Sequence, residues 1–199
     1  AANRRTQDLV LSEHADRLDS REGAAVVASR STKEDAVNDN VFESRRVVRS
    51  YRQTIEAPPD VVFPLLCPVR EADWLDGWAS TMVYSASGLV EDGAVFTTAN
   101  PGEEDTVWIV TRHDRGAGLV EFTRFTPGSR TCVLRIAVSQ YGDARSHVDV
   151  SFAYTSIARS GNEFLGEWTE NAFLAALVFW EKSMNHFLKT GDRLSRAAV

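Results

Sequence analysis

A cluster of tryptophan and carboxylate side chains between residues 73 and 78 is the densest group of chemistry-bearing residues in this sequence. The cluster reads DWLDGW. Because an indole combines a large apolar body with one hydrogen-bond donor, Trp74 and Trp78 suit the mouth of an apolar pocket or a lid over it. The same residues suit the packing of a short helix onto the edge of a sheet. Packing is the preferred interpretation, and the pocket role stays open for one of the two tryptophans.

Polar side chains at inward-facing strand positions would give such a pocket its specificity. Tyr84 and Tyr154 share a face with apolar residues on their expected strands, and so does Arg124. An arginine in that register must pair with an acid, reach solvent or meet an anionic ligand, because an unpaired buried charge is costly. A partner such as Glu170, or a place at the rim of a cavity, is the preferred interpretation.

The remaining candidates for catalysis are few. His113 and Asp114 suggest an acid–base pair, although they lie where a strand meets a turn and polar residues are ordinary. The four histidines are not spaced as metal ligands, so we expect no metal. The sequence contains no Gly-x-Ser-x-Gly, P-loop or Gly-x-Gly-x-x-Gly motif. Nothing therefore indicates a serine nucleophile or a nucleotide, and we expect no cofactor.

The composition is that of an ordinary soluble domain, with 43% hydrophobic and 25% charged residues. The net charge of -6 argues against a nucleic-acid-binding protein, which needs a clustered basic face. No window contains the roughly 18 apolar residues that an integral membrane segment requires. The two cysteines, Cys67 and Cys132, do not make a disulfide framework, and reduced thiols favour a cytoplasmic protein. A homodimer is left open.

Residues 1–43 differ from the rest of the chain and are predicted to be an N-terminal extension before a single domain at 44–199. The first aromatic residue is Phe42. Leu11, Ala15 and Leu18 share one helical face, so residues 8–21 suit a weak amphipathic helix. Residues 23–40 have little apolar surface to bury, which favours flexibility. The extension is therefore expected to be flexible or weakly helical.

Alternation of apolar and polar residues predicts about seven strands. Short turns such as Asp92-Gly93 separate most of them, and consecutive strands joined in this way make an antiparallel meander. The expected strands cover residues 45–57, 80–87, 94–99, 105–113, 119–126, 131–140 and 146–157.

Helices are expected at two places. After the first strand, Pro58 and Pro59 begin a short segment that Pro64 kinks or breaks, and a second short helix follows. Near the C-terminus, an apolar stripe at helical spacing predicts a helix over residues 169–190, with Thr169 as its N-cap. Residues 160–162 are interpreted as the end of the last strand. The long helix has the length to cross an antiparallel sheet and cover its apolar face.

This order of elements resembles the helix-grip fold of the START and pollen-allergen-like superfamily, also called SRPBCC. IEAPPDVVF at 55–63 resembles the opening of its bacterial polyketide cyclase-like branch, as do WIVT at 108–111, EFTR at 121–124 and EFL at 163–165. The resemblance covers about residues 45–190. It implies an α+β fold in which a curved antiparallel sheet wraps around the C-terminal helix, with a cavity opening near the two short helices. The superfamily has no universal catalytic motif, so no residue inherits a catalytic role.

We predict that the protein binds a small hydrophobic or amphipathic molecule, lipids included, in an internal cavity. One alternative is an enzyme of the polyketide cyclase or dehydratase type, and another is a chaperone-regulator-like module whose cavity is filled by side chains. Buried, tuned polar residues would distinguish the enzyme, and the sequence shows few. The residues expected to contact the ligand are the tryptophan pair and large side chains on apolar faces: Trp74, Trp78, Tyr84, Trp108, Phe122, Arg124, Tyr154, Phe173, Leu177 and Trp180.

Overall fold

The computed structural model describes residues 42–100 and 102–198 of the chain. The extension predicted for residues 1–43 lies outside these residues except for its last two, Phe42 and Glu43, which are exposed. Its conformation therefore stays a prediction.

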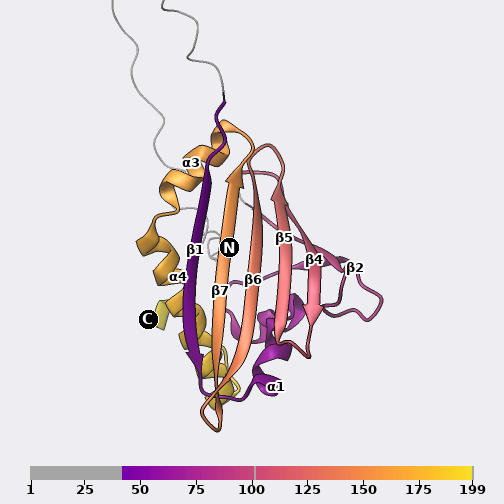
Figure 1. The fold of residues 1–199 in the computed structure, drawn as a ribbon, viewed down its shortest axis with the longest axis vertical. Helices are drawn as coiled ribbons and strands as arrows, with labels where there is room; N and C mark the ends of the chain where they lie inside the picture. The colour runs from indigo at the N-terminus through magenta and orange to yellow at the C-terminus, as the bar shows by residue number, and fades with distance from the viewer. Residues whose placement is uncertain (1–41, 101, 199) are drawn as a thin grey trace, which may run out of the picture.

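Seven strands form one antiparallel sheet (Figure 1). From β2 onward each strand pairs with the next along the chain, and β1 pairs with β7, so the order is β1-β7-β6-β5-β4-β3-β2. The predicted meander and the number of strands are confirmed. The strands are β1 (Arg46–Ile55), β2 (Thr81–Tyr84), β3 (Val95–Thr98), β4 (Thr106–Asp114), β5 (Leu119–Thr126), β6 (Arg130–Tyr141) and β7 (Arg145–Ser156).

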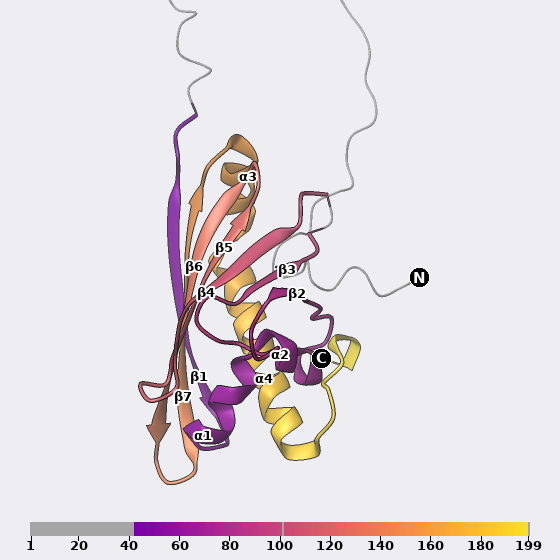
Figure 2. The same ribbon diagram turned by 90° about the vertical axis from the view of Figure 1, so that its right-hand side faces the viewer.

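The two short helices and the long one lie on the same side of this curved sheet (Figure 2). The chain leaves β1 into α1 (Pro59–Val62), and Pro64 then converts the helix to a 3-10 turn, η2 (Phe63–Leu66), before α2 (Pro68–Trp74). The long helix α4 (Glu170–Thr190) begins where the Thr169 side chain accepts a hydrogen bond from the Ala172 amide, 3.2 Å away. The broken helix and the N-cap were both predicted from the sequence.

One helix was missed. Residues 160–162 belong to α3 (Arg159–Glu167) and do not form a turn. The sequence Ser-Gly-Asn is typical of turns, and no side chain caps the helix at Ala158, so no local signal marks its start. Gly161 instead serves packing, because a Cβ atom there would lie 2.1 Å from the carbonyl oxygen of Ser129. A tertiary contact therefore explains a glycine that local rules assign to a turn.

The core lies between the concave face of the sheet and α4. Side chains of β7 alternate between buried and half-buried along the strand, as the period of two predicted. Two contacts hold α4 close to β1: Gln53 Nε2 donates to the Leu177 carbonyl oxygen at 2.9 Å, and Tyr51 donates to Glu181 at 3.0 Å. Since the helix is held near this edge, the concave face of β3–β5 must be covered by something else.

Short helix η3 (Arg196–Ala198) ends the described part of the chain. It follows α4 and returns toward α2, where Leu194 forms an isolated bridge with Leu75. Among the described residues, no helix has the length and apolarity needed to cross a membrane.

Candidate functional site

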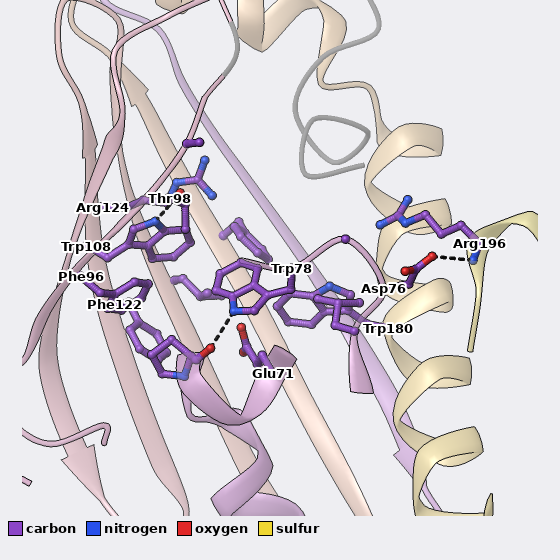
Figure 3. A pocket seen from close by; sticks show the side chains of 16 residues that line it. Glu71, Asp76, Trp78, Phe96, Thr98, Trp108, Phe122, Arg124, Trp180 and Arg196 are labelled. Carbon is purple, nitrogen blue, oxygen red and sulfur yellow. Dashed lines mark hydrogen bonds between the residues drawn. The ribbon is translucent and has the colours of Figure 1, made fainter. Parts of the chain in front are cut away.

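A cavity lies where α2 and the loop after it cover the concave face of the sheet (Figure 3). Its volume is about 60 Å³, counted as the space open to the centre of a water-sized sphere. One water molecule needs about 10–15 Å³ on this measure, so several waters or one small molecule fit. The residues that line it are Pro68, Glu71, Leu75, Asp76, Gly77, Trp78, Phe96, Thr98, Ala99, Trp108, Phe122, Arg124, Leu134, Phe152, Trp180 and Arg196.

Aromatic rings from three neighbouring strands form one wall. Phe96 and Trp108 face each other across β3 and β4 and stack with their ring centroids 5.4 Å apart. Phe122 of β5 meets both rings edge-on, at 6.1 and 6.2 Å. Trp78 extends this set from the loop after α2, with its ring 6.1 Å from that of Trp108. Such pairs hold one another in place, which gives the cavity flat and rigid apolar walls.

The loop after α2 is fixed from both sides. Trp78 Nε1 donates to the carbonyl oxygen of Pro68 at 2.7 Å, and the backbone amide of Arg196 donates to Asp76 at 3.0 Å (Figure 3). The Arg196 guanidinium lies over the ring of Phe179, 4.3 Å from its centroid. Burial lowers the pKa of Arg196, and the nearby Asp76 carboxylate opposes that shift. The segment after α4 thus forms part of the cavity rim.

Arg124 is the buried cation of the site. It projects from β5, is 4% exposed, and lies over Trp108 with its guanidinium carbon 4.5 Å from the ring centroid. It also lies 5.2 Å from the ring of Tyr154. Its Nη2 atom is buried and has no hydrogen-bond partner among the described residues. The ion pair considered with Glu170 is not formed, since Glu170 pairs with Arg49 at 3.8 Å.

Glu71 is the buried acid of the site. This α2 residue is 5% exposed and lines the cavity. Its carboxyl group makes no side-chain hydrogen bond within the described part of the chain, and burial raises its pKa to about 8. Most copies are therefore protonated at pH 7. A neutral carboxyl group both donates and accepts hydrogen bonds, so Glu71 is equipped to bind a polar group or to transfer a proton.

A layer of buried polar residues borders the Arg124 end of the cavity. Thr98 accepts a hydrogen bond from Trp108 Nε1 at 3.0 Å, and the Thr106 and Thr126 hydroxyls lie 2.9 Å apart. Arg130, 1% exposed, pairs with Glu103 at 2.8 Å. This layer is continuous with Arg124, since Arg130 lies two residues before the Cys132 that pairs with Arg124 across the sheet. The Arg124 end of the cavity is therefore polar.

The structure brings half of the residues predicted for the ligand site to the cavity: Trp78, Trp108, Phe122, Arg124 and Trp180. Four others are buried beside it in the core: Trp74, Tyr154, Phe173 and Leu177. Trp74 packs edge-on against Trp180, 6.1 Å away, and donates to the Leu65 carbonyl oxygen. The two tryptophans of the 73–78 cluster therefore have different positions: Trp74 packs α2 onto the core, and Trp78 lines the cavity.

Tyr84 is the correction in that set. It was expected to face inward with Met82, but it is 63% exposed. The pairing of β2 with β3 shifts register between Met82 and Tyr84, and such an irregularity turns the next side chain to the other face. Tyr84 therefore cannot anchor a ligand in this cavity.

Sequence reasoning missed three polar residues of the site: Glu71, Thr98 and Arg196. A signal existed for Thr98, which shares a strand face with Phe96. Glu71 carries no signal, since a single acid in a short helix is ordinary. Arg196 lies beyond the end of the predicted helix over residues 169–190, in a segment without a predicted element.

Other sequence candidates do not form a second site. Asp114 pairs with Arg112 at 2.9 Å, and the His113 ring packs 5.2 Å from Phe63, so these neighbours do not act as an acid–base pair. Within residues 42–100 and 102–198, no three His, Cys, Asp or Glu side chains gather as metal ligands.

Comparison with known proteins was made by sequence and by structure. No protein-family model matches the chain, and no curated protein matches it by sequence. Solved structures do match. Norcoclaurine synthase from Thalictrum flavum, in complex with dopamine and hydroxybenzaldehyde, has a TM-score of 0.56 at 13% identity, covering 84% of this chain and 97% of its own.

Two further matches are similar in extent. Zhui aromatase/cyclase from Streptomyces sp. R1128 has a TM-score of 0.53 at 11% identity and covers 76% of this chain and 100% of its own. Ara h 8.0201 has a TM-score of 0.51 at 14% identity and covers 73% and 99%. At these identities the likeness establishes the fold, and it confirms the architecture predicted from the sequence.

Proposed function

We propose that this chain, which has the helix-grip fold of the SRPBCC or START-like superfamily, binds a small amphipathic aromatic molecule in the cavity beneath α2. One observation carries the proposal: a cavity walled by stacked rings with ionisable groups at its margins. Aromatic walls hold flat ligands through offset and edge-on contacts. The walls are aromatic and the space is small, which suits rings better than the long acyl chains of lipids.

The fold supports the proposal by analogy. The matching norcoclaurine synthase structure contains dopamine and hydroxybenzaldehyde, which are small aromatic molecules. Folds host many functions, so the cavity of this chain, and not the names of its structural neighbours, supports the proposal.

Binding of an uncharged fluorescent aromatic probe, 1-aminoanthracene, tests the proposal. We expect saturable binding with a blue-shifted emission, because the probe leaves water for an apolar site. A Leu134→Trp substitution puts a bulky indole in place of a leucine side chain that lines the cavity and is expected to weaken binding by about tenfold or more, equivalent to ~1.4 kcal/mol. The affinities of the variant and the parent can be compared only if circular dichroism shows that the variant is folded.

Val133→Trp is the matched control. Val133 is the neighbour of Leu134 on β6 but points away from the cavity and is 37% exposed, so probe affinity should stay that of the parent. Equal loss in both variants, or a folded parent that does not bind the probe, would refute the proposal. The second outcome would favour the chaperone-regulator-like alternative, in which side chains fill the interior.

A second candidate function is an acid–base enzyme of the cyclase or dehydratase type. The observation that favours it is Glu71, a buried carboxyl group on the cavity wall whose pKa lies near 8 and thus within reach of physiological pH. Glu71→Gln separates the two functions. The variant would keep its affinity for a neutral probe, whereas an enzyme that depends on proton transfer by Glu71 would lose turnover.

A further inference from the structure

The hydrogen-bonding groups at the Arg124 end of the cavity are donors. Arg124 Nη2 is buried without a partner, and a guanidinium has no acceptor atom. The Thr98 hydroxyl oxygen accepts from Trp108 Nε1 at 3.0 Å, which leaves its own hydrogen to donate. Figure 3 shows Thr98 and the Arg124 guanidinium side by side at the top of the cavity. A ligand group at this end must therefore accept hydrogen bonds.

The charges around Arg124 do not balance. Arg124 and Arg130 are both buried, and Glu103 is the carboxylate that pairs with them, through Arg130 alone. Burial raises the pKa of Cys132 to about 11 and also raises that of Tyr154, so both side chains next to Arg124 are neutral. A buried cation without a counter-charge is destabilising, and a bound anion would remove that cost.

The opposite end of the cavity differs in character. Glu71 lies there, separated from Arg124 by the rings of Trp78 and Trp108 (Figure 3). Because its carboxyl group is mostly protonated at pH 7, it does not repel an anion held at the other end. The cavity thus has Arg124 at one end, rings in the middle and Glu71 at the other end, with Asp76 and Arg196 at the rim.

We infer that the molecule bound in this cavity is an aromatic carboxylate, whose anionic group is recognised by the Arg124 guanidinium and the Thr98 hydroxyl. The inference rests on the proposed function and adds the charge and orientation of the ligand. The planar guanidinium matches a carboxylate in shape, and its stacking on Trp108 holds it ready for that contact.

Two probes of the same shape test the inference: 2-naphthoate, an anion at pH 7, and 2-naphthamide, its neutral counterpart. Isothermal titration calorimetry at pH 7 should show that the parent binds the naphthoate about tenfold or more tightly than the naphthamide. In Arg124→Met, which keeps an unbranched, flexible side chain but is shorter and uncharged, the two affinities should become equal or the amide should bind better. The preference should survive moderate salt, because a buried contact is weakly screened.

Arg145→Met is the matched control. Arg145 also lies over an aromatic ring, that of Tyr141 at 4.6 Å, but its side chain is 44% exposed and lies outside the cavity. This variant loses the same net charge and should keep the preference for naphthoate. Loss of the preference in both variants would show a general charge effect and refute the inference.

The parent alone decides the question if Arg124→Met does not fold. Equal affinities for the two probes would overturn the carboxylate inference and leave the proposed function standing. If the parent binds neither probe nor 1-aminoanthracene, the proposed function itself fails.

Discussion

Glu71 and Arg124 are buried ionisable residues that line the same cavity, but their burial is accommodated in different ways. A carboxyl group can take up a proton and become neutral, which is why burial raises the pKa of Glu71 to about 8. A guanidinium has no comparable route to a neutral form, and that of Arg124 stacks on Trp108. The charge of Glu71 therefore depends on pH, whereas Arg124 would be stabilised by a counter-charge.

The Glu71 shift makes a prediction about stability. The pKa rises from 4.5 in the unfolded chain to about 8 in the folded one, so the folded state holds more protons between these values. The free energy of unfolding therefore falls as pH rises from about 4.5 to 8 and levels off above that. In Glu71→Gln this loss should be absent, so the variant should gain on the parent by on the order of 1 kcal/mol per pH unit.

Urea denaturation of both proteins from pH 4.5 to 9 measures this difference. Asp76, Arg124 and Arg196 also face the cavity, but they are present in both proteins and cancel in the comparison. Glu163→Gln, an exposed change on α3, is the control and should follow the parent at every pH. Parallel curves for Glu71→Gln and the parent would show that Glu71 is ionised in the folded protein.

At the scale of elements, periodicity accounts for what sequence could predict. The strands of residues 119–126 and 146–157 and the long helix alternate or repeat over enough residues to fix their positions to within one or two residues. Elements without a repeated pattern were not predictable in this way. The predicted inward register of Tyr84 is wrong because of an irregularity in β2. Helix α3 was not predicted because Gly161 packs against the backbone of Ser129, 32 residues away in the chain.

The two glycines of α3 give the matched test of that explanation. Gly161→Ala places a Cβ atom 2.1 Å from the Ser129 carbonyl oxygen, and should destabilise the protein by about 1–3 kcal/mol. Gly166→Ala meets nothing within 4 Å and should stabilise the helix by up to ~1 kcal/mol. Thermal melts of the two variants should therefore move in opposite directions. Equal shifts would mean that helix propensity, and not the contact with Ser129, determines how a substitution at residue 161 changes the melting temperature.

At the scale of the whole molecule, the cavity follows from where α4 lies. Gln53 and Tyr51 hold the helix near β1, and α2 with its loop covers the strands that the helix leaves open. The aromatic wall was predictable, since Trp108 and Phe122 lie on apolar strand faces. The polar residues were harder, because Glu71 and Arg196 reach the cavity through packing of distant segments. Arg124 was placed correctly in register, but its lack of a partner needed the structure.

The N-terminal extension, residues 1–43, is predicted to be dispensable for the fold of the domain. The pairs between β1 and β7 begin at Arg46, and just before them Ser44 Oγ donates to the Ser156 carbonyl oxygen at 2.7 Å. The first strand is thus anchored by residues that remain after the extension is shortened. Deleting residues 1–40 should shift the melting temperature by only a few degrees, where ~2–4 °C corresponds to about 1 kcal/mol for a chain of this size. Circular dichroism melts of the full and shortened chains measure the shift, and affinity for 1-aminoanthracene should be unchanged. Loss of folding on deletion would show instead that apolar residues of the extension, such as Leu11 and Leu18, dock on the domain.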